Sequence, residues 1–251
     1  MGLNVGMSAT FEEIDRRVTP MGEITVRRRL EPTLQVDVYE VKLGDEFLMS
    51  SLFTVAEVAL ATLGLAEFSG ADLDVVVAGL GLGYTARAVL EDPRVRSLRV
   101  VEALDAVIGW HEQHLLPHAE VLTADLRCQL VHGDFFASAT GESSFGLDGV
   151  DRVHAFLVDI DHSPRHLLHA SHAAFYTPDG LRRLAARLHP GGVFALWADG
   201  APDTEFATVV ASVFASCVAH VVSFPNFYTG EESSSTVYVA KVADVRAGEV
   251  A

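Results

Sequence analysis

The feature that most limits how this chain can fold is a run of alternating glycines directly after an apolar strand. Residues 75–78 read Val-Val-Val-Ala, and Gly79, Gly81 and Gly83 follow with leucines between them. A short, wholly apolar strand is typical of the buried middle of a parallel sheet. Glycines at the turn into a helix allow a tight bend and bring backbone amides close to a ligand. The sequence therefore predicts a strand–turn–helix unit that binds a ligand at these glycines.

Strands and helices alternate over the rest of this region. Apolar runs predict further strands at 98–101, 129–132, 155–158 and 193–197, and helical spacing predicts helices at 84–90, 105–115, 167–175, 181–187 and 205–215. Two last strands, at 219–224 and 235–242, have no helix between them. This order predicts a Rossmann-like α/β fold, with a mostly parallel seven-stranded sheet and one antiparallel strand at the C-terminal end.

The first fifty residues follow a different pattern. Strand-like runs at 24–28, 34–43 and 47–49, with a turn at 44–45, predict a small antiparallel β appendage. Thr54, with Glu57 three residues later, has the spacing of a capping box at the start of a helix over 55–65. We therefore expect two domains, an appendage at 1–53 and a ligand-binding domain at 54–251.

Charge and composition limit the classes of ligand and partner that we expect this protein to bind. The 251 residues include 34 acidic and 18 basic side chains, which gives a formal net charge of −16. A surface of this charge repels nucleic acid and anionic membranes and favours a cationic ligand. No apolar run reaches the roughly 18 residues that a membrane helix needs. With two cysteines, Cys128 and Cys217, and no signal-like N-terminal stretch, the expected location is the cytoplasm.

Acidic residues follow the next two predicted strands. Glu102 ends the run at 98–101 and lies at about the 20-residue spacing from the first glycine that is expected of an acid binding ribose hydroxyls. Asp134 follows the strand at 129–132, where a carboxylate can accept a hydrogen bond from an adenine amino group and Phe135 offers apolar contact to the base. Together with the glycines, these residues predict a nucleoside site.

The order of these elements resembles class I methyltransferase-fold proteins and, more narrowly, the spermidine synthase (polyamine aminopropyltransferase) family. The resemblance rests on GLGLG at 79–83, VVEALDAVI at 100–108, HGDFF at 132–136 and LVDIDHSP at 157–164. It implies decarboxylated S-adenosylmethionine or S-adenosylmethionine as co-substrate and a polyamine or other amine as acceptor. It also implies Asp159 as the catalytic residue, Asp161 as a substrate-binding residue and a homodimer.

Two departures from the family pattern keep other functions open. Leucines stand between the glycines where the family has an aspartate, and residues 48–53 read LMSSLF where the family has a glutamine and a tyrosine-histidine-glutamate run. The alternatives are a methyltransferase that uses S-adenosylmethionine on a small amine or other nucleophile, and a non-catalytic homologue that binds a nucleoside.

Four histidines are spaced three or four residues apart within and just before the helix predicted at 167–175. If helical, His162, His166, His169 and His172 would place several imidazoles on one face, near Asp159 or Asp161. Helical histidines without a closed set of ligands are typical of polar surfaces, so we expect no metal.

Overall fold

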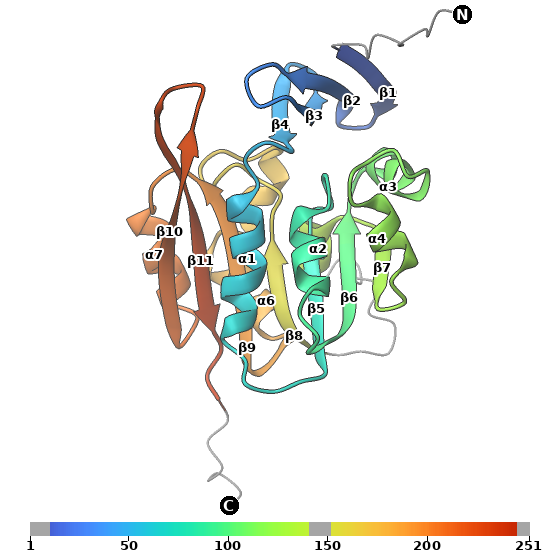
Figure 1. The fold of residues 1–251 in the computed structure, drawn as a ribbon. Coiled ribbons are helices and arrows are strands. Elements are labelled where there is room, and N and C mark those ends of the chain that lie inside the picture. Colours follow the sequence, from blue (N-terminus) through green and yellow to red (C-terminus); the bar gives the residue numbers. More distant parts are fainter. Residues whose placement is uncertain (1–10, 141–151, 245–251) are drawn as a thin grey trace, which may run out of the picture.

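Two β-sheets organise the chain, and the small one lies above the strand ends of the large one (Figure 1). The computed structural model describes residues 11–140 and 152–244. The small sheet has four antiparallel strands in sequence order: β1 (Phe11–Thr19), β2 (Gly22–Glu31), β3 (Val36–Leu43) and β4 (Glu46–Ser50). The sequence did not predict β1, because its residues FEEIDRRVT are mostly charged and lie largely exposed.

The large sheet has the strand order β10-β11-β9-β8-β5-β6-β7. From β9 to β7 all neighbours are parallel, whereas β11 is antiparallel to both β9 and β10. This confirms the predicted fold class. The strands are β5 (Leu73–Ala78), β6 (Val95–Glu102), β7 (Cys128–His132), β8 (Val153–Val158), β9 (Leu188–Asp199), β10 (Ser216–Asn226) and β11 (Glu231–Lys241).

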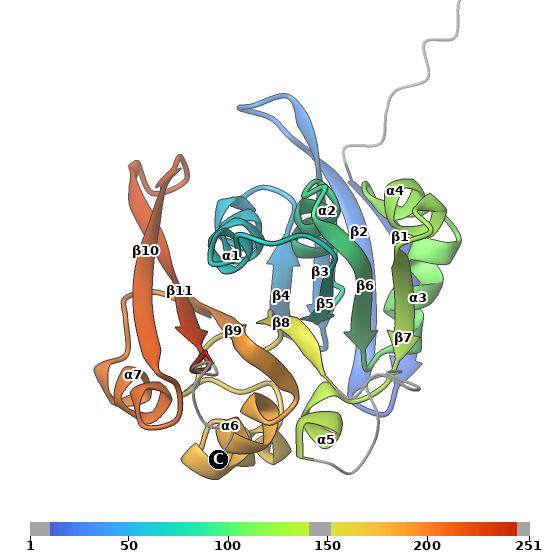
Figure 2. The same ribbon diagram turned by 90° about the horizontal axis from the view of Figure 1, so that it is seen from below.

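Helices cover both faces of the large sheet (Figure 2). They bury its apolar side chains. One face carries α1 (Val55–Ala66), α2 (Tyr84–Leu90), α3 (Asp105–Glu112) and α4 (Ala119–Ala124). The other carries α5 (Phe135–Thr140), α6 (Pro178–Ala185) and α7 (Thr204–Ala211). β5 is buried at every position. Its side chains alternate between two apolar cores, one on each face of the sheet. Within 11–140 and 152–244, no helix combines the length and apolar character needed to cross a membrane.

Two local expectations are wrong. Thr54 makes no side-chain cap at the start of α1, so the capping box does not form. The helix expected at 167–175 is reduced to a short 3₁₀ turn, η1 (Ala170–Ala174). In both cases tertiary contacts override a local pattern: Glu57 is buried against the rest of the protein, and Asp161 draws the later segment into an irregular path.

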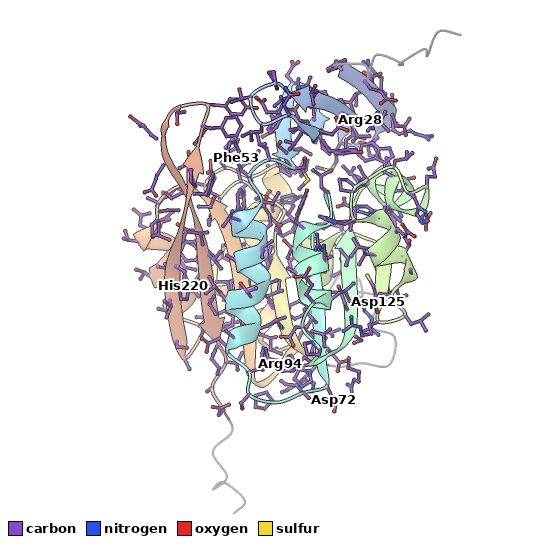
Figure 3. All side chains as sticks on the ribbon, in the orientation of Figure 1. Arg28, Phe53, Asp72, Arg94, Asp125 and His220 are labelled. Carbon is purple, nitrogen blue, oxygen red and sulfur yellow. The ribbon has the colours of Figure 1, made fainter. Side chains whose placement is uncertain are left out.

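Among the contacts between the small sheet and the rest of the protein, two hydrogen bonds lie at separated points. On one side the buried indole of Trp110, in α3, donates a hydrogen bond of 2.8 Å to Asp15 of β1. On the other side Tyr228, in the turn between β10 and β11, donates its hydroxyl to Glu31 at 2.7 Å. Phe53 packs beside this contact, with its ring centroid 5.6 Å from those of Phe224 and Phe227 (Figure 3).

Candidate active site

A cavity of about 420 Å³ lies between the small sheet and the ends of β5, β6, β7 and β8. This volume is in the usual range for small-molecule sites. The strand order turns back between β5 and β8, and open α/β sheets bind ligands beyond the carboxyl ends of their strands at such a point. The apolar roof comes from the small sheet: Met21, Ile24, Val41, Leu43, Leu48 and Met49.

The glycine turn forms part of the floor. Gly79 and Gly81 line the cavity with φ angles of 93° and 46°, in the left-handed region that favours glycine. A Cβ on Gly79 would collide with the backbone carbonyl of Asp159, and a Cβ on Gly81 would collide with the thioether of Met49. Gly83 packs instead against Leu122, where a Cβ would come within 2.7 Å of the leucine side chain. The turn is therefore fixed by its neighbours before any ligand binds.

Glu102 lies at the end of β6 and also lines the cavity. Its carboxylate accepts the backbone N–H groups of Leu80 at 3.0 Å and Leu104 at 2.8 Å. Burial raises the pKa of Glu102, and these backbone N–H groups oppose that effect. A carboxylate offers about four lone-pair sites, so acceptor positions remain for the hydroxyl groups of a ligand.

Asp134 and Phe135 are both in the wall, in different roles. Asp134 is exposed and caps α5, because its Oδ1 accepts the N–H groups of Phe136 at 2.8 Å and Ala137 at 3.1 Å. Phe135 is 2% exposed, and its ring packs edge-on against Phe136 and Phe175. Asp134 therefore retains a carboxylate oxygen at the cavity edge, and Phe135 belongs mainly to the apolar core.

Asp159, just after β8, lines the cavity together with Glu57. The hydroxyl of Thr85, in α2, donates to Asp159 Oδ2 at 2.8 Å. Burial raises the pKa of Asp159. Burial and the negative charge of Asp159 raise the pKa of Glu57. The site thus holds two neighbouring carboxyl groups with raised pKa values, and Glu57, which the charge of Asp159 also affects, keeps its proton to the higher pH.

The raised pKa values predict how stability changes with pH. A carboxyl group whose pKa is higher in the folded than in the unfolded chain stabilises the fold below its ordinary pKa, and this contribution is lost as the pH rises through the folded value. For Glu57 the loss begins near the ordinary value of 4.5. It amounts to about 1.4 kcal/mol for each pH unit by which the pKa is raised.

Glu57→Gln should therefore lose less stability than the wild type between about pH 5 and about pH 8. Urea unfolding at the two pH values measures the difference. The same replacement at Glu67, an exposed residue that follows α1, is the control and should keep the wild-type dependence. An equal pH dependence in wild type and Glu57→Gln would show that Glu57 is not held protonated by its surroundings.

Asp161 lies outside the cavity lining that the structure describes. It is 2% exposed, and its carboxylate accepts hydrogen bonds from the backbone N–H of Leu168 at 2.7 Å and the hydroxyl of Tyr176 at 2.8 Å. His172 Nδ1 lies 2.8 Å from the same carboxylate. Asp161 therefore holds the segment after β8 in place, and its predicted contact with substrate stays a prediction.

The structure places in the site several residues that the sequence patterns did not assign to it. Glu57 was interpreted as a capping residue, and its appearance opposite Asp159 depends on how α1 packs. The roof residues belong to no motif, because an apolar strand has the same sequence pattern whether it covers a core or a ligand. His162, His169 and His172 line the cavity, although they do not share a helical face.

Comparison with known proteins agrees with this arrangement at the level of the fold. No protein-family model and no curated protein sequence matches the chain. Among solved structures, a spermidine synthase in complex with the transition-state analogue AdoDATO is similar over 91% of this chain and 73% of its own, with a TM-score of 0.70 and 15% identity. A spermidine synthase from Thermotoga maritima covers 91% and 72%, with a TM-score of 0.67 and 15% identity. The chain therefore has the fold of the spermidine synthases, and its own N-terminal sheet lies over the site.

Proposed function

We propose that this protein is a transferase that moves an aminopropyl group from decarboxylated S-adenosylmethionine to an amine of the polyamine class. The observation that carries the proposal is the pair of carboxyl groups, buried Glu57 and half-buried Asp159, placed in the cavity wall beside the glycine turn. The similar structure with a bound transition-state analogue supports it, because that protein is a spermidine synthase.

The floor of the cavity suits the nucleoside part of such a co-substrate. Glu102 has acceptor positions for ribose hydroxyls, and Asp134 offers an oxygen at the edge where an adenine amino group would lie. Gly79 and Gly81 let the ligand approach the backbone closely. These residues fit the group that the fold implies.

Asp159 is suited to bind and deprotonate an amine, with the protonated Glu57 beside it. The attacking nitrogen must be neutral, and a carboxylate with a raised pKa is a better proton acceptor near neutral pH than one with an ordinary pKa. As the new N–C bond forms, the C–S bond of the sulfonium breaks, its electron pair stays on sulfur, and the amine proton passes to Asp159. The apolar roof offers packing for the methylene groups of the acceptor.

A second candidate is methyl transfer from S-adenosylmethionine to an amine. The observation that favours it is Met49, whose Sδ accepts the N–H of Leu82 at 3.2 Å and lies directly over Gly81. With this thioether and the side chain of Leu80, the wall beside the glycine turn offers apolar groups at the place where the family has an aspartate. Alignment of an amine by Asp159 would serve either reaction.

Calorimetric titration with decarboxylated S-adenosylmethionine, S-adenosylmethionine and methylthioadenosine separates the candidates. We expect the decarboxylated ligand to bind more tightly than S-adenosylmethionine, and the protein to turn it over with putrescine. Tighter binding of S-adenosylmethionine without putrescine turnover would favour methyl transfer. Binding of methylthioadenosine without turnover of any amine would favour a non-catalytic nucleoside-binding protein, and binding of none of the three would reject the nucleoside site.

Glu102→Ala should weaken binding of methylthioadenosine by about 10- to 150-fold, because a hydrogen bond to a charged group contributes about 1.5–3 kcal/mol. Glu112→Ala, at an exposed acid in α3, is the matched control and should bind as the wild type does. Calorimetry measures both affinities. Equal affinity in Glu102→Ala and the wild type would remove Glu102 from the ligand contacts.

A further inference from the structure

Three potential metal ligands converge where the small sheet meets the segment after β8. Glu46, the first residue of β4, has its Oε1 3.2 Å from His162 Nε2 and 3.5 Å from His166 Nε2. The ligand atoms of the three residues all lie within 4.8 Å of one another. The two imidazole centroids are 4.7 Å apart. Two imidazoles thus point their Nε2 atoms at one carboxylate oxygen from the opposite side of a domain junction.

The spacing from Glu46 to each histidine matches the edge of a metal tetrahedron. Zinc binds histidine nitrogen and carboxylate oxygen at about 2.0–2.2 Å, which places neighbouring ligand atoms of a tetrahedron about 3.3–3.5 Å apart. The two distances from Glu46 agree with this value without any movement of the side chains. Imidazole nitrogen favours zinc and other first-row transition metals, whereas Mg²⁺ and Ca²⁺ favour oxygen ligands.

The backbone between the two histidines is held in one conformation. The N–H of Ser163 donates to the carbonyl of His166 at 3.3 Å, and the N–H of His166 donates to the carbonyl of Ser163 at 3.0 Å. The Ser163 hydroxyl also accepts the N–H of Arg165 at 3.2 Å. The carbonyl of His162 accepts the N–H of Asp199 at 2.7 Å. These bonds fix the backbone at both histidines, so little backbone ordering is needed when a ligand binds.

The charges around the three residues are favourable for a cation. Arg165, the nearest cationic side chain in the sequence, is turned to Asp203 and Glu205, with hydrogen bonds of 2.5 and 2.7 Å. The side chain of His166 is 67% exposed, so water can complete the coordination. His162 also lines the cavity, and Glu46 and His166 lie beside it, outside the lining.

We propose that Glu46, His162 and His166 form a binding site for a divalent transition metal, with zinc the ion that the geometry fits best. The ion would join the segment after β8 to β4 of the small sheet. The sequence patterns could not indicate the site, because Glu46 lies in the small sheet and the histidines lie in the segment after β8, and the histidines alone form no closed ligand set. The inference does not depend on the proposed transferase activity.

The test uses the untagged full-length protein, stripped with a chelator, reloaded with Zn²⁺ and dialysed. Elemental analysis should find one retained zinc per chain, and Co²⁺ in its place should give the strong visible absorption of a tetrahedral site. Glu46→Gln and His166→Asn should each lower zinc affinity at least about tenfold, since even outer-shell changes cost 10- to 100-fold. Zinc should raise the melting temperature of the wild type and not of these variants.

His169→Asn is the matched control, because His169 is exposed on the same segment and lies outside the cluster. This variant should retain zinc as the wild type does. Zinc retention that is unchanged in Glu46→Gln and His166→Asn would assign the metal to other histidines and overturn the proposal. Failure of the wild-type protein to retain zinc would overturn it as well. Both replaced side chains are at least partly exposed, so the variants are expected to fold.

Discussion

Asp159→Asn is expected to lower turnover of decarboxylated S-adenosylmethionine with putrescine by about 10²- to 10⁴-fold, the usual contribution of a general base. The amide keeps the size of the side chain and can still accept the hydrogen bond from Thr85. It cannot accept the amine proton. Affinity for methylthioadenosine, which has no attacking amine, should change little. Steady-state kinetics and calorimetry on the same preparation measure the two effects.

Stability provides an independent check on this variant. Because burial raises the pKa of Asp159, its carboxylate carries a desolvation penalty above that pKa, and the neutral amide removes the penalty. Asp159→Asn should therefore be at least as stable as the wild type near neutral pH. Asp179→Asn, at an exposed acid in α6, is the control and should keep full turnover. An Asp159→Asn enzyme that stays active would remove Asp159 from the chemistry.

Gly79→Ala is expected to destabilise the fold by about 2–5 kcal/mol. A φ of 93° is unfavourable for alanine, at a cost of about 1–2 kcal/mol. The new methyl group would also collide with the carbonyl of Asp159, and overpacking of this kind costs about 1–3 kcal/mol. The carbonyl belongs to the backbone just after β8 and has no rotamer that relieves the contact. Urea unfolding measures the loss.

Two other glycines separate these contributions. Gly200 has a φ of 75° with nothing near its missing Cβ, so Gly200→Ala should show the backbone cost alone, about 1–2 kcal/mol. Gly70 has open space and no left-handed φ, and Gly70→Ala should change stability by less than about 0.5 kcal/mol. If Gly79→Ala is no less stable than Gly200→Ala, the collision with Asp159 is not a constraint on the fold.

The sequence predicted the large sheet well because its signals are local. The apolar run of β5 and the glycines after it are contiguous, and α2 lies where helical spacing placed it, at 84–90. Glu102 and Asp134 were expected at the site because acids at the ends of neighbouring parallel strands meet at the same edge. The structure places both in the cavity wall.

The parts that could not be predicted are decided by contacts between distant residues. Glu57 has the spacing of a capping residue, and only the packing of α1 reveals it as a buried partner of Asp159. The segment from His162 to Tyr176 has helical spacing, yet three hydrogen-bond partners of Asp161 determine its path. The sequence of β1 has no alternating apolar pattern that would predict a strand, and pairing with β2 holds it in place.

The two hydrogen bonds at opposite sides of the small sheet bear on how ligands enter and leave the cavity. Bonds from Trp110 to Asp15 and from Tyr228 to Glu31 hold the roof at opposite sides, so lifting either side of the sheet would break the bond on that side. The exposed residues of the cavity wall include Met21, His169 and Ser171. They lie at the opening of the cavity between the β1–β2 turn and the segment after β8. Reactants and products are therefore expected to pass through this opening, and not beneath a lifted roof.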